Sequence, residues 1–90
     1  MWKAEVYVTL KKTVLDPQGA TVQNALGALG YKNVVEVRVG KFMELAIEGG
    51  DREQVAAQVE EMCRRLLANP VIEEFRYHLE EAAATGRQAP

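Results

Sequence analysis

The sequence predicts an α+β fold of the ferredoxin-like type, in which two helices cover one face of an antiparallel sheet. Apolar and polar side chains alternate in residues 2–11, 34–48 and 71–79. This two-residue period is typical of strands with one buried face. Between these stretches lie two segments with helix caps and apolar residues at helical spacing. The predicted order is therefore β-α-β-β-α-β, with a long central strand segment bent at Gly40.

The first part of the chain contains one strand and one helix. Apolar side chains occupy the even positions of residues 2–10, so one face of this strand is expected to be buried. The helix is predicted to begin with Asp16 as its N-cap and Pro17 at its first position, where the missing N–H costs nothing. Gly30 is expected to end this helix. The residues expected on its apolar face are Val22, Ala25, Leu26 and Leu29.

The central segment allows two arrangements at Gly40. A two-residue turn there would direct the apolar side chains of the following residues towards water, so the pattern disfavours it. A three-residue hairpin loop would pair Val39 with Met43 and keep the apolar face intact. The other arrangement is one continuous strand that bends at Gly40. Its fifteen residues would extend about 50 Å, which is longer than helices of this size could cover. A second chain would be needed to cover the part of the strand that extends beyond them.

The second half of the chain is predicted to contain a helix and a final strand. Asp51 and Gln54 form a capping box for the helix, and Asn69-Pro70 ends it. In the strand, Glu73 falls on the apolar side, which indicates an edge or rim. Residues 1–81 are expected to form a single domain, and residues 82–90 a flexible tail. The residues expected in the buried stripe of this helix are Val55, Val59, Met62, Cys63 and Leu66.

Length and composition limit the function. Ninety residues fit one domain, and a net charge of -2 disfavours nucleic-acid binding. The single Cys63 excludes an internal disulfide and a cysteine-based zinc site. No apolar stretch is long enough to span a membrane. Because the first strand is expected to begin almost at Met1, there is no room for a signal peptide. A soluble cytoplasmic protein is the expectation.

No catalytic residues and no metal ligands are expected in this chain. The only histidine, His78, lies on the polar side of a strand, and Cys63 belongs to a buried stripe. The sequence has no phosphate-binding glycine loop and no Ser/His/Asp set. Exposed aromatic residues suited to an RNA-binding sheet are limited to Tyr7 and Phe42. Two classes remain, a small-molecule-binding regulatory domain and a non-catalytic subunit of a larger assembly.

Two stretches are the best candidates for a binding site. Lys11, Lys12 and residues 16–19 join a strand to a helix N-terminus, where backbone N–H groups favour an anion. Arg38 and Lys41 place two cations beside the central bend. Because Lys41 interrupts an otherwise apolar register, it is expected to point at a partner.

Five strings of residues resemble the PurS family, the small subunit of bacterial and archaeal formylglycinamide ribonucleotide amidotransferase. They are VTLK at 8–11, VLDPQG at 14–19, the end of the first helix at 26–31, VRVGK at 37–41 and LLANPVIE at 66–73. These strings follow one another in the order and spacing of the family, and VLDPQG and VRVGK together are specific to it. The resemblance covers nearly the whole chain.

The resemblance implies a role in de novo purine synthesis. In that family a glutaminase subunit, PurQ, releases ammonia from glutamine. A synthetase subunit, PurL, uses ATP and magnesium to convert formylglycinamide ribonucleotide into the amidine. The small subunit is a dimer or tetramer that has no catalytic residues or cofactor, bridges the two larger subunits and supports ammonia transfer. The residues that the resemblance implies in partner binding are Lys11, Asp16, Pro17, Gln18, Gly19, Arg38, Gly40 and Lys41.

Overall fold

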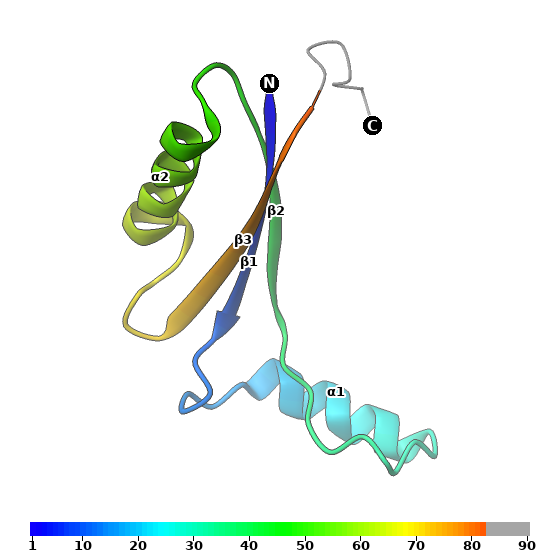
Figure 1. Ribbon diagram of the computed structural model, residues 1–90. Helices are drawn as coiled ribbons and strands as arrows, with labels where there is room; N and C mark the ends of the chain where they lie inside the picture. Colours follow the sequence, from blue (N-terminus) through cyan, green and yellow to red (C-terminus); the bar gives the residue numbers. More distant parts are fainter. Residues whose placement is uncertain (83–90) are drawn as a thin grey trace.

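The structure is a computed structural model that describes residues 1–82 (Figure 1). The tail expected at residues 82–90 therefore lies, apart from Ala82, outside the described residues. Within residues 1–82, no helix has the length and apolar content needed to cross a membrane. In chain order the elements are β1 (Trp2–Leu10), α1 (Pro17–Ala28), β2 (Gly40–Ile47), α2 (Arg52–Met62), the π-helical turn η1 (Cys63–Leu67) and β3 (Glu73–Glu81).

The three strands form one antiparallel sheet with β1 in the centre, in the order β2-β1-β3. Trp2 pairs with Ile47 on one side and with Glu81 on the other, so β1 has a partner along both edges. The alternation predicted for β1 is confirmed, because its even residues from Trp2 to Val8 are buried. The α+β class and the antiparallel sheet are confirmed as well.

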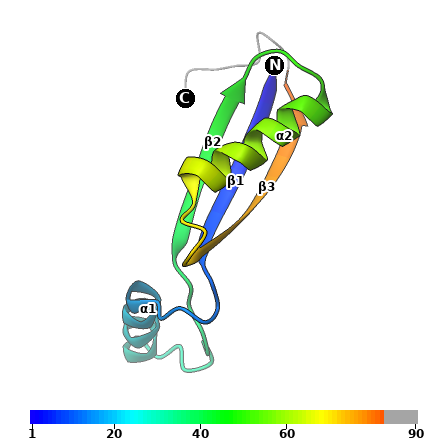
Figure 2. The same cartoon turned by 90° about the vertical axis from the view of Figure 1, so that its left-hand side faces the viewer.

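Helix α2 packs on the buried face of this sheet (Figure 2). Its side chains Val55 and Val59, together with Cys63 of η1, complete the core. The predicted capping box is present. The Asp51 carboxylate accepts from the Gln54 N–H at 2.9 Å, and the Gln54 side chain accepts from the Asp51 N–H at 3.2 Å. The sheet, α2 and η1 are called the body below.

The π-helical turn η1 changes which side chain faces the core. A π-helix has more residues per turn than an α-helix, so the residue that follows Cys63 on the buried side is Leu67 rather than Leu66. Leu66 is 82 % exposed, whereas Leu67 packs against the core and Ala68 is buried. The prediction that Leu66 would be buried is therefore wrong. The prediction for Met62, which precedes this turn, is also wrong, because this residue is 36 % exposed.

Helix α1 does not cover the sheet. It lies beyond the end of the strands (Figures 1 and 2), and Gly19 is its only buried residue. The prediction that two helices cover one face thus holds for α2 alone. Residues 11–39, which contain α1 and the extended segment 34–39, are called the arm below.

The segment 34–39 was predicted as a strand, but no strand pairs with it in the described chain. The reason is the register of the sheet. Thr9 of β1 lies opposite Gly40, so β1 ends before it can reach residues 34–39. These residues lead into β2 without a turn, which excludes the hairpin and leaves the continuous arrangement. The order within this chain is β-α-β-α-β.

The chain is elongated for its size. Its radius of gyration is 16.8 Å and its extents are 48 × 30 × 18 Å. A compact domain of this length has a radius of gyration of about 12 Å. The difference reflects the arm, which extends the chain past the body instead of folding back onto it.

Candidate functional site

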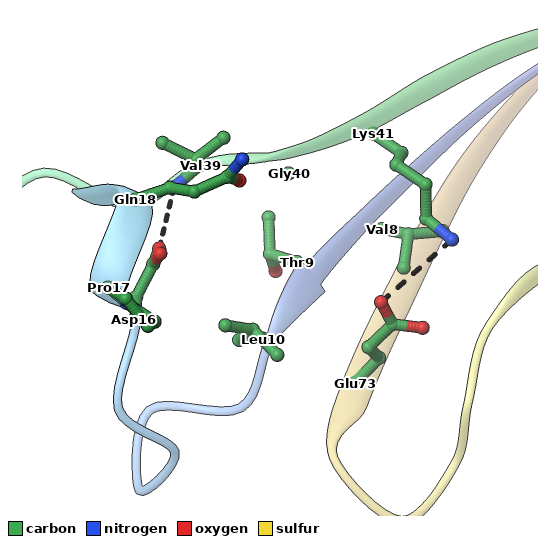
Figure 3. A pocket seen from close by; sticks show the side chains of 10 residues that line it. All are labelled: Val8, Thr9, Leu10, Asp16, Pro17, Gln18, Val39, Gly40, Lys41 and Glu73. Atoms are coloured by element: carbon green, nitrogen blue, oxygen red, sulfur yellow. Dashed lines mark hydrogen bonds and ion pairs between the residues drawn. The ribbon is translucent and has the colours of Figure 1, made fainter. Parts of the chain in front are cut away.

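The arm and the body meet at a hollow of about 460 Å³, called the junction here (Figure 3). The end of β1, the start of α1, the start of β2 and the first residue of β3 contribute to it. The junction brings together five of the eight residues predicted from the sequence, namely Asp16, Pro17, Gln18, Gly40 and Lys41. The other three, Lys11, Gly19 and Arg38, do not line the hollow, although each is next to a lining residue in the chain (Leu10, Gln18 and Val39).

Asp16 holds two segments of the arm together. Asp16 is 7 % exposed, and each of its carboxylate oxygens accepts one backbone hydrogen bond. Oδ1 accepts from Gly19 N at 2.9 Å, and Oδ2 accepts from Val39 N at 2.8 Å (Figure 3). The hydrogen bond from Val39, followed by that from Gly19, lowers the pKa of Asp16 below its ordinary value. Asp16 is therefore the predicted N-cap and also the link to the segment that enters β2.

Gly19 and Gly40 are required because other backbone atoms lie very close to them. A Cβ atom on Gly19 would lie 2.0 Å from the carbonyl oxygen of Val37. A Cβ atom on Gly40 would lie 2.3 Å from the carbonyl oxygen of Val8. Neither backbone oxygen can move away as a flexible side chain could. Glycine at these two positions therefore allows α1 to contact the extended segment and β2 to approach the end of β1.

Arg38 fixes the loop between β1 and α1. Its Nη2 donates to the carbonyl oxygens of Leu10 at 2.9 Å and Lys11 at 2.7 Å, and its Nη1 donates to that of Val14 at 3.5 Å. A guanidinium has several donors and can therefore bind three carbonyl oxygens at once. Arg38 therefore contributes to the shape of the site from within the protein.

Lys41, Pro17 and Gln18 form the accessible side of the junction. The Lys41 side chain is 57 % exposed, and its Nζ lies 3.9 Å from a Glu73 carboxylate oxygen (Figure 3). Pro17 and Gln18 are exposed at the first turn of α1. Lys11 donates its backbone N–H to the carbonyl oxygen of Ile72 at 2.9 Å, which ties the start of the arm to the body.

Glu73 is the junction residue that the sequence did not place in a site. The sequence signal for it is its position on the apolar side of a strand, and that position by itself indicates only an edge. Its ion pair with Lys41 joins two strands that are not neighbours in the sheet. A contact between residues so distant in the chain is not visible in local sequence patterns.

Two ionisable groups of the described residues are held within the fold. The carboxylate of Asp16 is occupied by two backbone N–H groups and is not free to act as a base. Cys63 is buried, and burial raises the pKa of its thiol above the ordinary value. Residues 1–82 contain no group of three or more histidine, cysteine, aspartate or glutamate side chains that could hold a metal ion.

Comparison with known proteins supports one family over nearly the whole chain. The model of the PurS family, described as phosphoribosylformylglycinamidine (FGAM) synthase, matches residues 3–81. The FGAM synthase subunit PurS of Bacillus subtilis is 55 % identical over 84 residues, which cover 93 % of this chain and 99 % of that protein. PurS of Methanocaldococcus jannaschii is 48 % identical over 81 residues, covering 90 % of this chain and 98 % of the relative.

Solved structures of similar proteins have the same fold. The crystal structure of Methanocaldococcus jannaschii PurS matches with a TM-score of 0.83 at 46 % identity and covers 92 % of this chain and all of that one. The structure of PurLQS from Thermotoga maritima contains a chain that matches with a TM-score of 0.80 at 30 % identity. That match covers 88 % of this chain and 96 % of the other.

The family model, the identity to curated relatives and the shared fold all lead to the family that the strings VLDPQG and VRVGK indicated. The relatives are covered over nearly their full length, so the likeness is not confined to a shared motif. The chain belongs to the PurS family of FGAM synthase subunits of purine biosynthesis.

Proposed function

We propose that this chain is the non-catalytic connecting subunit of an FGAM synthase in the cytoplasm. In this proposal it joins a PurL synthetase subunit to a PurQ glutaminase subunit and supports the transfer of glutamine-derived ammonia to formylglycinamide ribonucleotide. The observation that carries the proposal is the Thermotoga maritima structure of PurLQS, which contains a chain of this fold at a TM-score of 0.80.

In this proposal the chemistry takes place in the partners, and the synthetase subunit binds ATP and magnesium. The arrangement of the junction supports this division. The N–H of Gly19 in the first turn of α1, which could have received an anionic ligand, is already bound to the Asp16 carboxylate. This internal contact also disfavours the alternative of a regulatory domain with a small anion at this loop.

The eight predicted residues contribute to partner binding in two ways under this proposal. Pro17, Gln18 and Lys41 are exposed and contact a partner directly. The remaining residues act through the backbone that they hold, by hydrogen bonds, by close approach or by the tie to Ile72. These are Lys11, Asp16, Gly19, Arg38 and Gly40.

The proposed assembly also contains a second copy of this chain, as a homodimer or a tetramer. The arm exposes apolar side chains that water does not favour, with exposed fractions of 81 % for Leu15, 74 % for Leu29 and 87 % for Val35. Its segment 34–39 is extended, and β2 is an edge strand with one side unpaired in the described chain. A second arm would cover the apolar side chains, and a second strand could pair with this edge.

The oligomer can be tested by its mass in solution. We expect light scattering to give the mass of a dimer or tetramer for the unsubstituted chain, and a shift towards monomer for Leu29→Lys on α1. The matched control is Leu66→Lys, a residue of similar exposure on the body. A monomeric unsubstituted chain at micromolar concentration would contradict the presence of a second copy.

The connecting role can be tested by comparing two nitrogen sources. Purified PurL and PurQ are assayed for amidine product with glutamine or with ammonia, each with and without this chain. We expect glutamine-driven turnover to require the chain and ammonia-driven turnover to proceed without it. If the chain changes neither rate, the connecting role is wrong. If it changes both equally, it acts on the synthetase rather than on ammonia transfer.

A further inference from the structure

The sheet has a second face that no described element covers (Figure 1). This open face consists of the odd residues of β1, from Lys3 to Thr9, and the residues paired with them on β2 and β3. Because α2 packs on the opposite face and α1 lies past the end of the strands, the open face is available along the whole sheet. A one-sided sheet of this kind is a candidate for a protein interface.

An aromatic band crosses the middle of the open face. Tyr7 lies opposite Phe42 on one side and opposite Arg76 on the other. The rings of Tyr7 and Phe42 are 5.1 Å apart between centroids, and the Arg76 guanidinium lies 4.8 Å from the centre of the Tyr7 ring. Phe42 is 52 % exposed although it is a large apolar residue. Aromatic residues and arginine are the types enriched at the centres of protein interfaces.

Carboxylates surround this band. Glu5 and Glu44 lie directly opposite each other on neighbouring strands, an arrangement of like charges that does not favour the sheet itself. Lys3 partly compensates them, with its Nζ 3.7 Å from Glu5 and 3.3 Å from Glu44. Glu74 and Glu80 add two more carboxylates on the same face, so its acids outnumber its permanent cations.

The charge of the open face decides between its possible occupants. A second copy placed face to face would bring carboxylates against carboxylates, and a nucleic acid would be repelled by the same groups. A protein surface with lysine or arginine residues around an apolar centre would complement both the acids and the Phe42 ring. The exposed apolar side chains of the arm, in contrast, are suited to contact with a second copy of this chain.

We propose that the open face is the docking surface for one of the large subunits of the synthase, which presents basic residues around an apolar contact. This inference rests on the proposed function, because it assumes that the chain binds those subunits. Phe42 and Tyr7 form the centre of the contact, and Glu5 and Glu44 pair with the basic residues of the partner. In this proposal the large subunit contacts the open face in addition to Pro17, Gln18 and Lys41 at the junction, whereas a second copy covers the apolar side chains of the arm.

The test is a binding assay with the PurL and PurQ subunits of the same source. The variant is Phe42→Ala/Glu44→Lys on the open face. The matched control is Met62→Ala/Glu61→Lys, which makes the same kinds of change at exposed positions of α2. We expect the dissociation constant of the open-face variant to rise at least about tenfold and that of the control to stay within about twofold of the parent. Circular dichroism and light scattering should show an unchanged fold and oligomer.

Three outcomes would overturn the inference. In the first, the open-face variant binds as tightly as the parent. In the second, it loses its oligomeric mass, which would assign the face to a second copy. In the third, the unsubstituted chain fails to bind either subunit, and then the proposed function itself is wrong. If the double variant does not fold, Glu44→Lys alone is measured, since this side chain is 56 % exposed. Binding as tight as the parent would again overturn the proposal.

Discussion

The body and the arm are held together by different forces. In the body, Val6, Val8, Val55 and Val59 are buried between the sheet and α2, so removal of apolar surface from water stabilises it. In the arm, the apolar side chains point outwards, and the fold depends on hydrogen bonds of Asp16 and Arg38 to backbone groups. The difference shows that a helix can be held in place by hydrogen bonds within its own chain while its apolar side chains stay exposed.

Two helical valines provide the sharpest comparison between the regions. Val59 of α2 is fully buried, whereas Val22 of α1 is 41 % exposed. Val59→Ala is expected to lower the free energy of unfolding by about 2 kcal/mol, because it leaves a cavity in the core. Val22→Ala is expected to change it by less than about 0.5 kcal/mol in the isolated chain, because alanine also favours the helix. Urea denaturation measures both.

The same pair tests whether a second copy covers the arm. The measurement is repeated at protein concentrations above and below dissociation of the oligomer. Val22→Ala should then become destabilising only where the oligomer is present. An equal loss for both valines at low concentration would show that α1 packs within its own chain, contrary to the structure.

Substitutions at two glycines of α1 distinguish the effect of a close backbone contact on stability from the effect of helix propensity. Gly19→Ala places a Cβ atom against the carbonyl oxygen of Val37, whereas a Cβ atom on Gly27 has no atom within 4 Å outside its own helix. Gly19→Ala is expected to destabilise the protein by about 1–3 kcal/mol. Gly27→Ala is expected to stabilise it by about 0.5–1 kcal/mol. Thermal unfolding would refute this reading if the two variants shifted in the same direction.

Acid should loosen the arm through Asp16. Its pKa is lowered in the folded state from the ordinary value of 3.8, because Val39 and Gly19 donate to the charged carboxylate. A lowered pKa means that Asp16 stabilises the fold above that ordinary value, and that this contribution is lost as the pH falls through the folded pKa. Asp16→Asn should therefore show a smaller fall in Tm on acidification. Identical Tm profiles for both proteins would contradict the two hydrogen bonds.

Lys41 is expected to have the smallest effect on stability. An ion pair at 3.9 Å between Lys41 and Glu73, with the lysine largely exposed, contributes less than about 0.5 kcal/mol. Lys41→Ala should leave the urea midpoint unchanged and weaken binding to the large subunits, with Lys32→Ala on the exposed part of the arm as control. A loss of stability without a loss of binding would assign Lys41 to the fold instead.

Local signals in the sequence predicted the elements whose causes are local. The N-cap at Asp16, the capping box at Asp51 and the alternation of β1 each depend on residues a few positions apart, and all three are present. The change from Leu66 to Leu67 on the buried side could not be predicted, because a π-turn leaves no clear mark in the apolar pattern.

The misplaced strand at residues 34–39 has a different cause. Its alternation indicates that one face is suited to burial, but in the structure Val35 of this segment is 87 % exposed. The site shows the same limit. The sequence indicated Asp16, Gly40 and Lys41 from their local context, whereas their meeting with Glu73 at one hollow depends on the register of the sheet. Whether these residues contact a partner remains a prediction.

The central position of β1 has a consequence for the order of folding. β1 is synthesised before both of its partners, β2 and β3, and its residue Trp2 pairs with Ile47 and Glu81. Contacts that span almost the whole described chain close slowly, and an apolar strand without neighbours is open to aggregation in the meantime. The hydrogen bonds of Asp16 and Arg38 in the arm stay within residues 10–39, so they can form before either pairing. The nascent chain can therefore form α1 before it acquires a core.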